Sequence, residues 1–383
     1  MLHHSQRMLL VTFITCVSIF PSGPAWSFAG RPDQEKTAGE AYKNVQVFKD
    51  VPESQLLQAM FFMEGSLGVS CTYCHVNFVD FEKDDKPTKQ AARRMIVMVR
   101  DLNERSFDSR LAVTCNTCHR GQAKPSAPLA FAPTSKPAPM PRPEVPTVSP
   151  TVDQLFASYL TATGGAAFNA VTTLVLRGTR TSSEGWTAPV ERLQRTADKF
   201  VSTMQLGGRP WQSAWDGEIG WGRDNQGVHA LQGRDLALER LEAAFLYATR
   251  LRAMVDSLAA GQATVLGNRA VGVVNGHLND VGSTNLFFDL RSGLLVRVSV
   301  SVESPFGPVP EVFDLADYRT VDKITIPLSI SHLKPDFSDL DHFSSVKVNQ
   351  PIDDVSFRRP GSSAQTSFNG LDSPGLVNRQ LLP

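Results

Sequence analysis

The spacing of apolar residues changes along the chain. In the N-terminal third, apolar residues recur every three to four positions, which is typical of amphipathic helices. A helix is expected to open at Asp50-Val51-Pro52, because proline is favoured in a first helical turn. Leu56, Met60, Met63 and Leu67 then share one face of this helix.

A second helix is predicted to open at Pro87-Thr88. Its apolar residues Ala91, Met95, Met98 and Leu102 recur at helical spacing. Each of the two expected helices therefore presents a pair of methionines.

Beyond residue 150 the pattern changes to alternation, which is typical of half-buried strands. Alternating stretches are followed or separated by turn signals and by two helical patterns. The strands are expected at Thr172–Thr179, Lys199–Leu206 and Leu294–Val302, the turns at Asp216-Gly217 and Asn275-Gly276, and the helices at Thr151–Thr161 and Arg234–Leu258. The predicted fold class is α+β, with a small, mostly helical domain before a domain rich in antiparallel β-sheet.

Both ends and the middle of the chain have a different composition. An apolar run of about thirteen residues after Arg7 is followed by small residues up to Ala29, which predicts a signal peptide over residues 1–29. Nine of the 27 residues from Lys124 to Pro150 are proline, which favours an extended spacer. The expected division is a signal peptide (1–29), an N-terminal domain (30–123), a linker (124–150), a C-terminal domain (151–360) and a flexible tail (361–383).

Composition and charge exclude several classes of protein. The 383 residues include 38 Lys plus Arg and 38 Asp plus Glu, so the formal net charge is zero. This balance gives no electrostatic reason to expect binding to nucleic acid. With 42% hydrophobic and 20% charged residues, the chain is also not expected to be disordered as a whole.

The cysteines suggest the chemistry. Cys71-Thr72-Tyr73-Cys74-His75 and Cys115-Asn116-Thr117-Cys118-His119 are two copies of Cys-x-x-Cys-His. Two thiols one helical turn apart can each bond a vinyl group on one edge of a haem, and the following histidine can bind its iron. We therefore expect two covalently bound c-type haems, held by Cys71, Cys74, Cys115 and Cys118, with His75 and His119 as iron ligands.

The cysteine pairs also allow two other interpretations. A structural zinc site also uses pairs of Cys-x-x-Cys, and a single pair can act as a dithiol redox centre. Zinc does not require a histidine at the same offset in both copies. An export signal also predicts an oxidising compartment, where four-thiolate zinc sites are unusual.

The second axial ligand of each haem follows by elimination. Only His75 and His119 of the eight histidines lie between residues 30 and 150, whereas methionines are concentrated on the two expected helices. Methionine sulfur is a soft ligand that raises the reduction potential of a haem. Spacing alone does not choose between Met60 and Met63, or between Met95 and Met98.

The sequence resembles the cytochrome c subunit of photosynthetic reaction centres between about residues 44 and 121. The matching stretches are NVQVFKDVP (44–52), LLQAMFFMEGSLGVSCTYCH (56–75), ARRMIVMVRDLN (92–103) and VTCNTCHRG (113–121). The resemblance implies that the first methionine of each pair is the ligand, which gives Met60 and Met95. It also implies single-electron transfer with a redox protein or a membrane electron-transfer complex.

Three departures from this family stand out. Its best-known members carry four haems, whereas this chain has two motifs, and the histidine that follows the ARRM helix in the family is absent between Glu104 and Leu111. The C-terminal half has no counterpart in the family. Its segments FDLRSGLLVR (288–297), DYR (317–319) and PIDDVSF (351–357) faintly resemble the half-barrels of lipoprotein carrier proteins, which leaves a hydrophobic ligand open as an alternative.

Two classes of function follow. The favoured one is an extracytoplasmic dihaem electron carrier without a substrate-transforming site, either in the periplasm or at the membrane periphery. The alternative is a peroxidase-like haem enzyme in which one iron keeps an open position. Methionines available for both haems favour the electron carrier.

Overall fold

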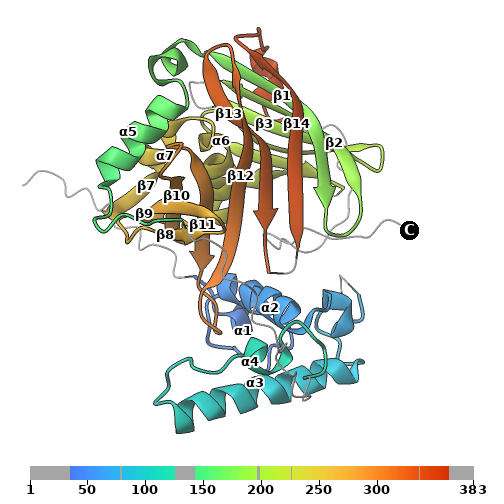
Figure 1. The fold of residues 1–383 in the computed structure, drawn as a ribbon. Helices are drawn as coiled ribbons and strands as arrows, with labels where there is room; N and C mark the ends of the chain where they lie inside the picture. The colour runs from blue at the N-terminus through green and yellow to red at the C-terminus, as the bar shows by residue number, and fades with distance from the viewer. Residues whose placement is uncertain are drawn as a thin grey trace, which may run out of the picture. The chain divides into compact units, whose positions relative to one another are not determined.

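The structure is a computed structural model that describes residues 35–77, 80–125, 143–195, 199–225, 227–335 and 337–361. The expected signal peptide, most of the proline-rich linker and nearly all of the tail lie outside these residues. Helices dominate before the linker and antiparallel strands after it (Figure 1). The predicted α+β class is confirmed.

Five short or medium helical segments make up the helical region, residues 35–125. They are α1 (Ala38–Ala41), α2 (Glu53–Leu67), the 3-10 turn η1 (Cys71–Tyr73), α3 (Pro87–Ser106) and α4 (Cys115–His119). Pro52 precedes α2, and the left-handed Gly68 ends it. Pro87 is the first residue of α3, as the sequence predicts.

The helical region has a small apolar core. Phe48, Ala59 and Ile96 are buried in it together with Phe306, which lies far away in the sequence. The ring of Phe306 meets that of Phe48 edge-on and stacks on that of Phe62, each with 5.3 Å between ring centroids. The segment after residue 300 therefore contributes an aromatic side chain to the core beneath α2.

A large antiparallel sheet follows the linker. Its strand order is β6-β5-β4-β3-β2-β1-β14-β13-β12-β11-β10-β9-β7, and β8 pairs with β9. The strands are β1 (Thr173–Ser182), β2 (Thr187–Arg195), β3 (Lys199–Leu206), β4 (Arg209–Trp215), β5 (Gly220–Asp224), β6 (Gly227–Leu231), β7 (Val255–Ala260), β8 (Thr264–Leu266), β9 (Arg269–Leu278), β10 (Gly282–Asp289), β11 (Leu295–Val302), β12 (Val309–Val321), β13 (Ile324–Leu333) and β14 (Ser338–Val348). Nearly every strand pairs with its neighbour in the sequence, and β14 returns to pair with β1.

One face of the sheet packs against helices α5 (Val152–Ala162), α6 (Gly233–Ala244) and α7 (Ala248–Met254). Figure 1 shows the strands curving around these helices. Thr151 caps α5 by accepting a hydrogen bond from the Gln154 amide, which fixes where the helix begins. Two 3-10 turns, η2 (Gly165–Ala170) and η3 (Asp354–Phe357), complete the region.

Two sequence-based expectations are wrong in this region. The helix expected over Arg234–Leu258 is instead α6, α7 and the start of β7, because Phe245 and Leu246 turn into the core between the helices. Asn275-Gly276 is not a turn but lies inside β9. A side chain at Gly276 would overlap Val255 and approach the Asp256 carbonyl to 2.9 Å, so this glycine permits close contact with the edge strand.

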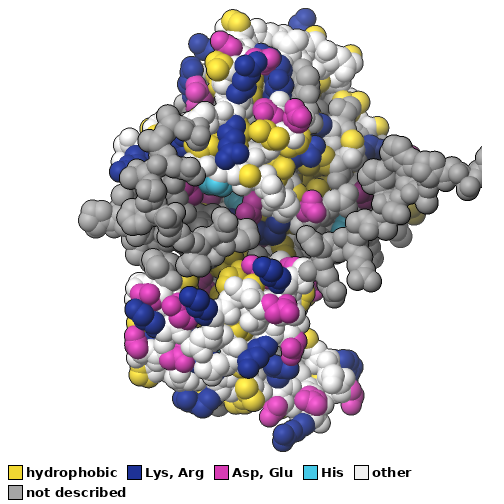
Figure 2. Space-filling model, turned by 180° about the vertical axis from the view of Figure 1, so that it is seen from behind, with side chains coloured by type: hydrophobic (Ala, Val, Ile, Leu, Met, Phe, Trp, Pro, Cys, Tyr) yellow, Lys and Arg dark blue, Asp and Glu magenta, His cyan; other side chains and the backbone are white. Residues whose placement is uncertain are grey.

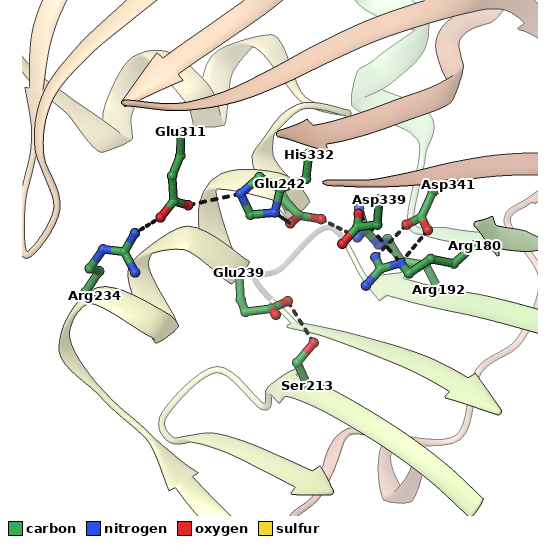
Figure 3. A network of polar contacts seen from close by, with 10 residues as sticks. All are labelled: Arg180, Arg192, Ser213, Arg234, Glu239, Glu242, Glu311, His332, Asp339 and Asp341. Atoms are coloured by element: carbon green, nitrogen blue, oxygen red, sulfur yellow. Dashed lines mark hydrogen bonds and ion pairs between the residues drawn. The ribbon is translucent and has the colours of Figure 1, made fainter. Parts of the chain in front are cut away.

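A network of charged side chains lies between α6 and the strands (Figure 3). Arg180 of β1 makes two hydrogen bonds, of 2.6 and 2.8 Å, to Asp341 across from it on β14. Glu242 of α6 pairs with Arg192 of β2 at 2.7 Å. The first pair joins β1 to β14, and the second joins α6 to the neighbouring strand β2.

The network continues toward β12. His332 lies 3.0 Å from Glu311, which also pairs with Arg234 of α6. Burial alone would raise the pKa of Glu311, but the His332 hydrogen bond and the nearby Lys334 and Arg234 lower it to about 2. Because Glu311 is only 4% exposed, its charge is stabilised by these partners rather than by water.

The described residues include no helix long and apolar enough to cross a membrane. On the face drawn in Figure 2, basic and acidic side chains are interspersed. This distribution agrees with the zero formal net charge.

We predict that Glu311 stabilises the fold at neutral pH and that this contribution is lost in acid. Its folded pKa of about 2 lies below the ordinary 4.5, so the stabilisation is complete above pH 4.5 and disappears as the pH falls toward 2. Glu311→Gln should lower the free energy of unfolding by up to about 3 kcal/mol at pH 7. It should also flatten the pH dependence of that free energy between pH 5 and 3.

The measurement is urea unfolding across this pH range. Glu303→Gln, which removes an exposed carboxylate, is the matched control and should behave like the wild type. An unchanged acid slope in Glu311→Gln would contradict the prediction.

Candidate functional site

The first Cys-x-x-Cys-His motif forms a tight turn after α2. Cys71 opens the 3-10 turn η1, and its carbonyl accepts hydrogen bonds from the amides of Cys74 (3.2 Å) and His75 (2.9 Å). Residues three apart in one helical turn lie on the same side of it. The two thiols and the imidazole are therefore gathered on one short segment.

The His75 ring is oriented by the backbone. Its Nδ1 lies 3.1 Å from the carbonyl oxygen of Phe81. Because a carbonyl can only accept, Nδ1 carries the proton and Nε2 keeps its lone pair. Burial, together with the nearby cations Lys89, Arg93 and Lys86, lowers the pKa of His75 and favours the neutral imidazole that binds metals.

The second motif repeats this arrangement on α4. Thr114 and Thr117 form a capping box at the start of the helix, and Cys115, Cys118 and His119 follow within one turn and a half. The Nδ1 of His119 lies 2.9 Å from the carbonyl oxygen of Gln122. Nε2 of His119 therefore also keeps its lone pair.

Asn103 of α3 shapes the approach to the second motif. Its side-chain oxygen accepts hydrogen bonds from the amides of Ala112 and Val113, at 3.0 and 2.9 Å. Its side-chain nitrogen donates to the carbonyls of Val99 and Val113, at 3.1 and 2.7 Å. This buried amide fixes the segment that leads directly into Cys115.

A backbone contact joins the end of α2 to the residues after the second motif. The Gly121 amide donates to the Ser66 carbonyl at 2.8 Å. Gly68 has a φ of +63° there, and a Cβ on it would overlap the Gly121 carbonyl. The two motifs are thus held together where only glycine fits.

The two methionine pairs lie in different surroundings. Met60 and Met63 of α2 are half-buried, and Met63 packs against the small apolar core. Met95 and Met98 of α3 are 47% and 49% exposed. The methionine pair of α2 is thus half-buried, whereas that of α3 is exposed. Within each pair, both methionines lie near the same face of their helix.

Helix α3 is apolar on two sides. Ile96, Val99 and Asn103 are buried against the rest of the region, whereas the neighbouring stripe of Met95, Met98 and Leu102 is exposed. The face predicted from the sequence is this exposed stripe. A row of large apolar side chains left open to solvent is typical of a ligand site.

These features fit a haem. The fit rests on the paired thiols, two histidines whose Nε2 atoms are available, and an uncovered methionine-bearing face. The zinc alternative fits less well, because among the described residues no three His, Cys, Asp or Glu side chains could share a metal ion. Burial raises the pKa of the Cys74 thiol, and it raises the pKa of the Cys115 thiol to about 11. A dithiol redox centre instead needs a cysteine whose pKa is lowered.

Two polar residues of the site were not identified from the sequence. Lys89 and Asn103 are 8% and 7% exposed, and both lie on α3 between the motifs. The only sequence signal for these two residues is that each is polar and lies on the same side of the helix as the apolar Ile96 and Val99. Charged and amide side chains are usually exposed, so this signal alone would not have singled them out.

Paired Cys-x-x-Cys-His turns with oriented histidines are typical of c-type cytochromes. Residues 24–144 match the family model of the photosynthetic reaction centre cytochrome C subunit. The resemblance seen in the sequence is confirmed over this part of the chain.

Curated relatives agree. The region is 34% identical over 113 residues to the photosynthetic reaction center cytochrome c subunit of Thermochromatium tepidum, covering 28% of each protein. It is 41% identical over 83 residues to cytochrome c-554 of Chloroflexus aurantiacus, covering 20% of each. The chain therefore spans little more than a quarter of the length of the first relative and a fifth of the length of the second.

Solved structures of the lipoprotein-carrier type also match. One is a putative outer membrane lipoprotein-sorting protein domain from Vibrio parahaemolyticus, with 9% identity and a TM-score of 0.39 over 53% of this chain and 97% of that one. Another is a LolA superfamily protein from Nitrosomonas europaea, with 10% identity and a TM-score of 0.40 over 55% and 98%. This is the class of protein that the C-terminal half faintly resembles in sequence, and a similarity this distant carries no conclusion about a ligand.

We predict that Asn103→Ala destabilises the helical region, because it leaves the half-buried amide and carbonyl groups of Val113 without their hydrogen-bond partners. Each buried group left unpaired costs about 1–3 kcal/mol. Urea unfolding should show a loss of at least about 2 kcal/mol. Glu104→Ala, at the neighbouring exposed position of α3, is the control and should change stability little. Equal stability of the two variants would contradict the role assigned to Asn103.

Proposed function

We propose that the N-terminal domain is an extracytoplasmic dihaem c-type cytochrome that passes single electrons between redox partners. In this proposal Cys71 and Cys74 would hold one haem, with His75 and Met60 as its iron ligands. Cys115 and Cys118 would hold the other, with His119 and Met95 as its iron ligands.

One observation carries the proposal. Both histidines point Nδ1–H at a backbone carbonyl, of Phe81 and of Gln122, so that both Nε2 atoms are available as ligands. Metal-binding histidines usually donate their other ring nitrogen in this way. The same histidine–carbonyl hydrogen bond occurs in both motifs. A purely structural role would not explain why it is repeated.

The residues of the chain then have definite roles. Bound haem supplies a one-electron couple at iron. The thiols fix its position, the histidine–carbonyl hydrogen bonds set the ring orientation, and Met95 with Met98 and Leu102 supplies an apolar cover. A small core such as that around Ile96 could not bury a haem unaided, and covalent attachment removes that need.

The most direct test is the mass and the spectrum of the purified mature protein. We expect two covalent haems, no free thiols, and reduced spectra that carbon monoxide does not change. A zinc-containing protein with four reactive thiols would overturn the proposal. Carbon monoxide binding to one haem would instead favour the peroxidase-like alternative, in which one iron has an open position.

The partners and location are part of the same proposal. The similarity to reaction centre cytochrome subunits supports a redox protein or a membrane electron-transfer complex as partner, and a periplasmic or membrane-peripheral location. A hydrophobic ligand for the C-terminal domain has weaker support. In the described residues, the sheet face toward α6 is filled by core side chains and by the charged network.

We predict that Met60→Ala and Met95→Ala each remove one axial ligand. Each variant should make one haem reactive toward carbon monoxide and lower its reduction potential, because thioether ligation favours reduced iron. Absorption spectra with and without carbon monoxide measure the first effect, and redox titration measures the second. Met63→Ala and Met98→Ala are the matched controls and should leave both haems six-coordinate. If carbon monoxide instead bound to a haem in these two variants, the second methionine of each pair would be the ligand.

We also propose the domain division at residues 124–150. A protease of broad specificity should cut within this segment, because proline-rich spacers have few protecting contacts. A denaturing gel stained for haem should then show both haems on the smaller, N-terminal fragment. Haem stain on the larger fragment would show that the division is wrong.

A further inference from the structure

Helix α3 holds the first motif through three cationic side chains. Lys86 donates to the Thr72 carbonyl, and Arg93 pairs with Asp84 at 2.8 Å. Lys89, between them, donates to the carbonyls of Phe81 (2.8 Å) and Lys83 (2.7 Å) and pairs with Asp84 at 2.9 Å. The Lys89 ammonium therefore makes two hydrogen bonds to the backbone and one ion pair.

The carbonyl of Phe81 is shared. It accepts one hydrogen bond from Lys89 and another from Nδ1 of His75. A carbonyl that already accepts from a cation is a poorer acceptor for a second donor. Lys89 therefore weakens the bond that would otherwise draw the Nδ1 proton away and make the imidazole electron-rich.

The second motif has no such arrangement among the described residues. His119 is oriented by the carbonyl of Gln122, and no lysine or arginine side chain is seen to donate to that oxygen. The two motifs match in their cysteines and histidines but differ in the charge beside the histidine. This difference is invisible in the Cys-x-x-Cys-His pattern.

We propose that Lys89 is a positioning residue that raises the reduction potential of the haem at Cys71–His75 and leaves that at Cys115–His119 unchanged. The inference rests on the proposed haem ligation by His75. Two effects act in the same direction. A less electron-rich imidazole stabilises ferric iron less, and a buried positive charge nearby favours the reduced state, which carries one positive charge fewer.

The test is spectroelectrochemical titration of the full-length protein with both haems attached. The two potentials are assigned with a Cys71→Ala/Cys74→Ala variant, which keeps only the second haem. Lys89→Met should lower the equilibrium constant for reducing the first haem about tenfold, which is about 59 mV for one electron. Lys89→Arg should restore most of this loss, and the second haem should not move in either variant.

A structural role alone would not produce this result. Lys89→Gln keeps a hydrogen-bond donor without the charge, and it replaces Lys89→Met if the latter does not fold. In the reduced protein, the proton resonance of His75 Nδ1–H should move downfield in Lys89→Met, as the hydrogen bond to Phe81 strengthens. An unchanged first potential, or an equal shift of both, would overturn the inference.

These outcomes differ from a failure of the proposed function. That failure would appear in the wild type, as missing covalent haem or a spectrum without histidine–methionine ligation. A normal wild-type spectrum with no effect of Lys89→Met would reject only the role of Lys89.

Discussion

Helix α3 is the element on which both candidate haem sites depend. Its first turns carry Lys89, which holds the loop that orients His75, and its last turn carries Asn103, which holds the segment leading to Cys115. Both side chains are buried and hydrogen-bonded to the backbone, so displacing the helix would leave polar groups without partners at both ends. One rigid helix thus fixes the position of two ligand sets relative to each other.

The same helix explains why the helical region can be so small. Ile96 and Val99 face a core of few residues, while the parallel stripe of Met95, Met98 and Leu102 remains uncovered. A covalently attached apolar group on that stripe would add buried surface that the chain itself does not provide. Gly68 and Gly121 bring the backbone of the two motifs together without side chains, which saves further volume.

Much of this organisation was predictable from the sequence, and the exceptions have physical causes. Proline signals placed the starts of α2 and α3 correctly, and alternation identified β1, β3 and β11, because these signals are local. The turn predicted at Asn275-Gly276 is wrong because Gly276 lies inside a strand. It is a glycine because the close approach of β7 leaves no room for a side chain, and this tertiary contact cannot be read from the local sequence. Lys89 was missed for the same reason, since its partners Phe81 and Lys83 become partners only when the loop folds back onto α3.

The two halves of the chain handle buried charge differently. In the sheet region, Arg192, Glu242, His332 and Glu311 neutralise one another in a network that anchors α6, so the charges stabilise the position of a helix. Near His75, Lys89 and Arg93 share the single carboxylate of Asp84, so positive charge remains. A surplus of buried positive charge has no structural advantage by itself. Under the proposed ligation of haem iron by His75, this charge would favour the reduced state.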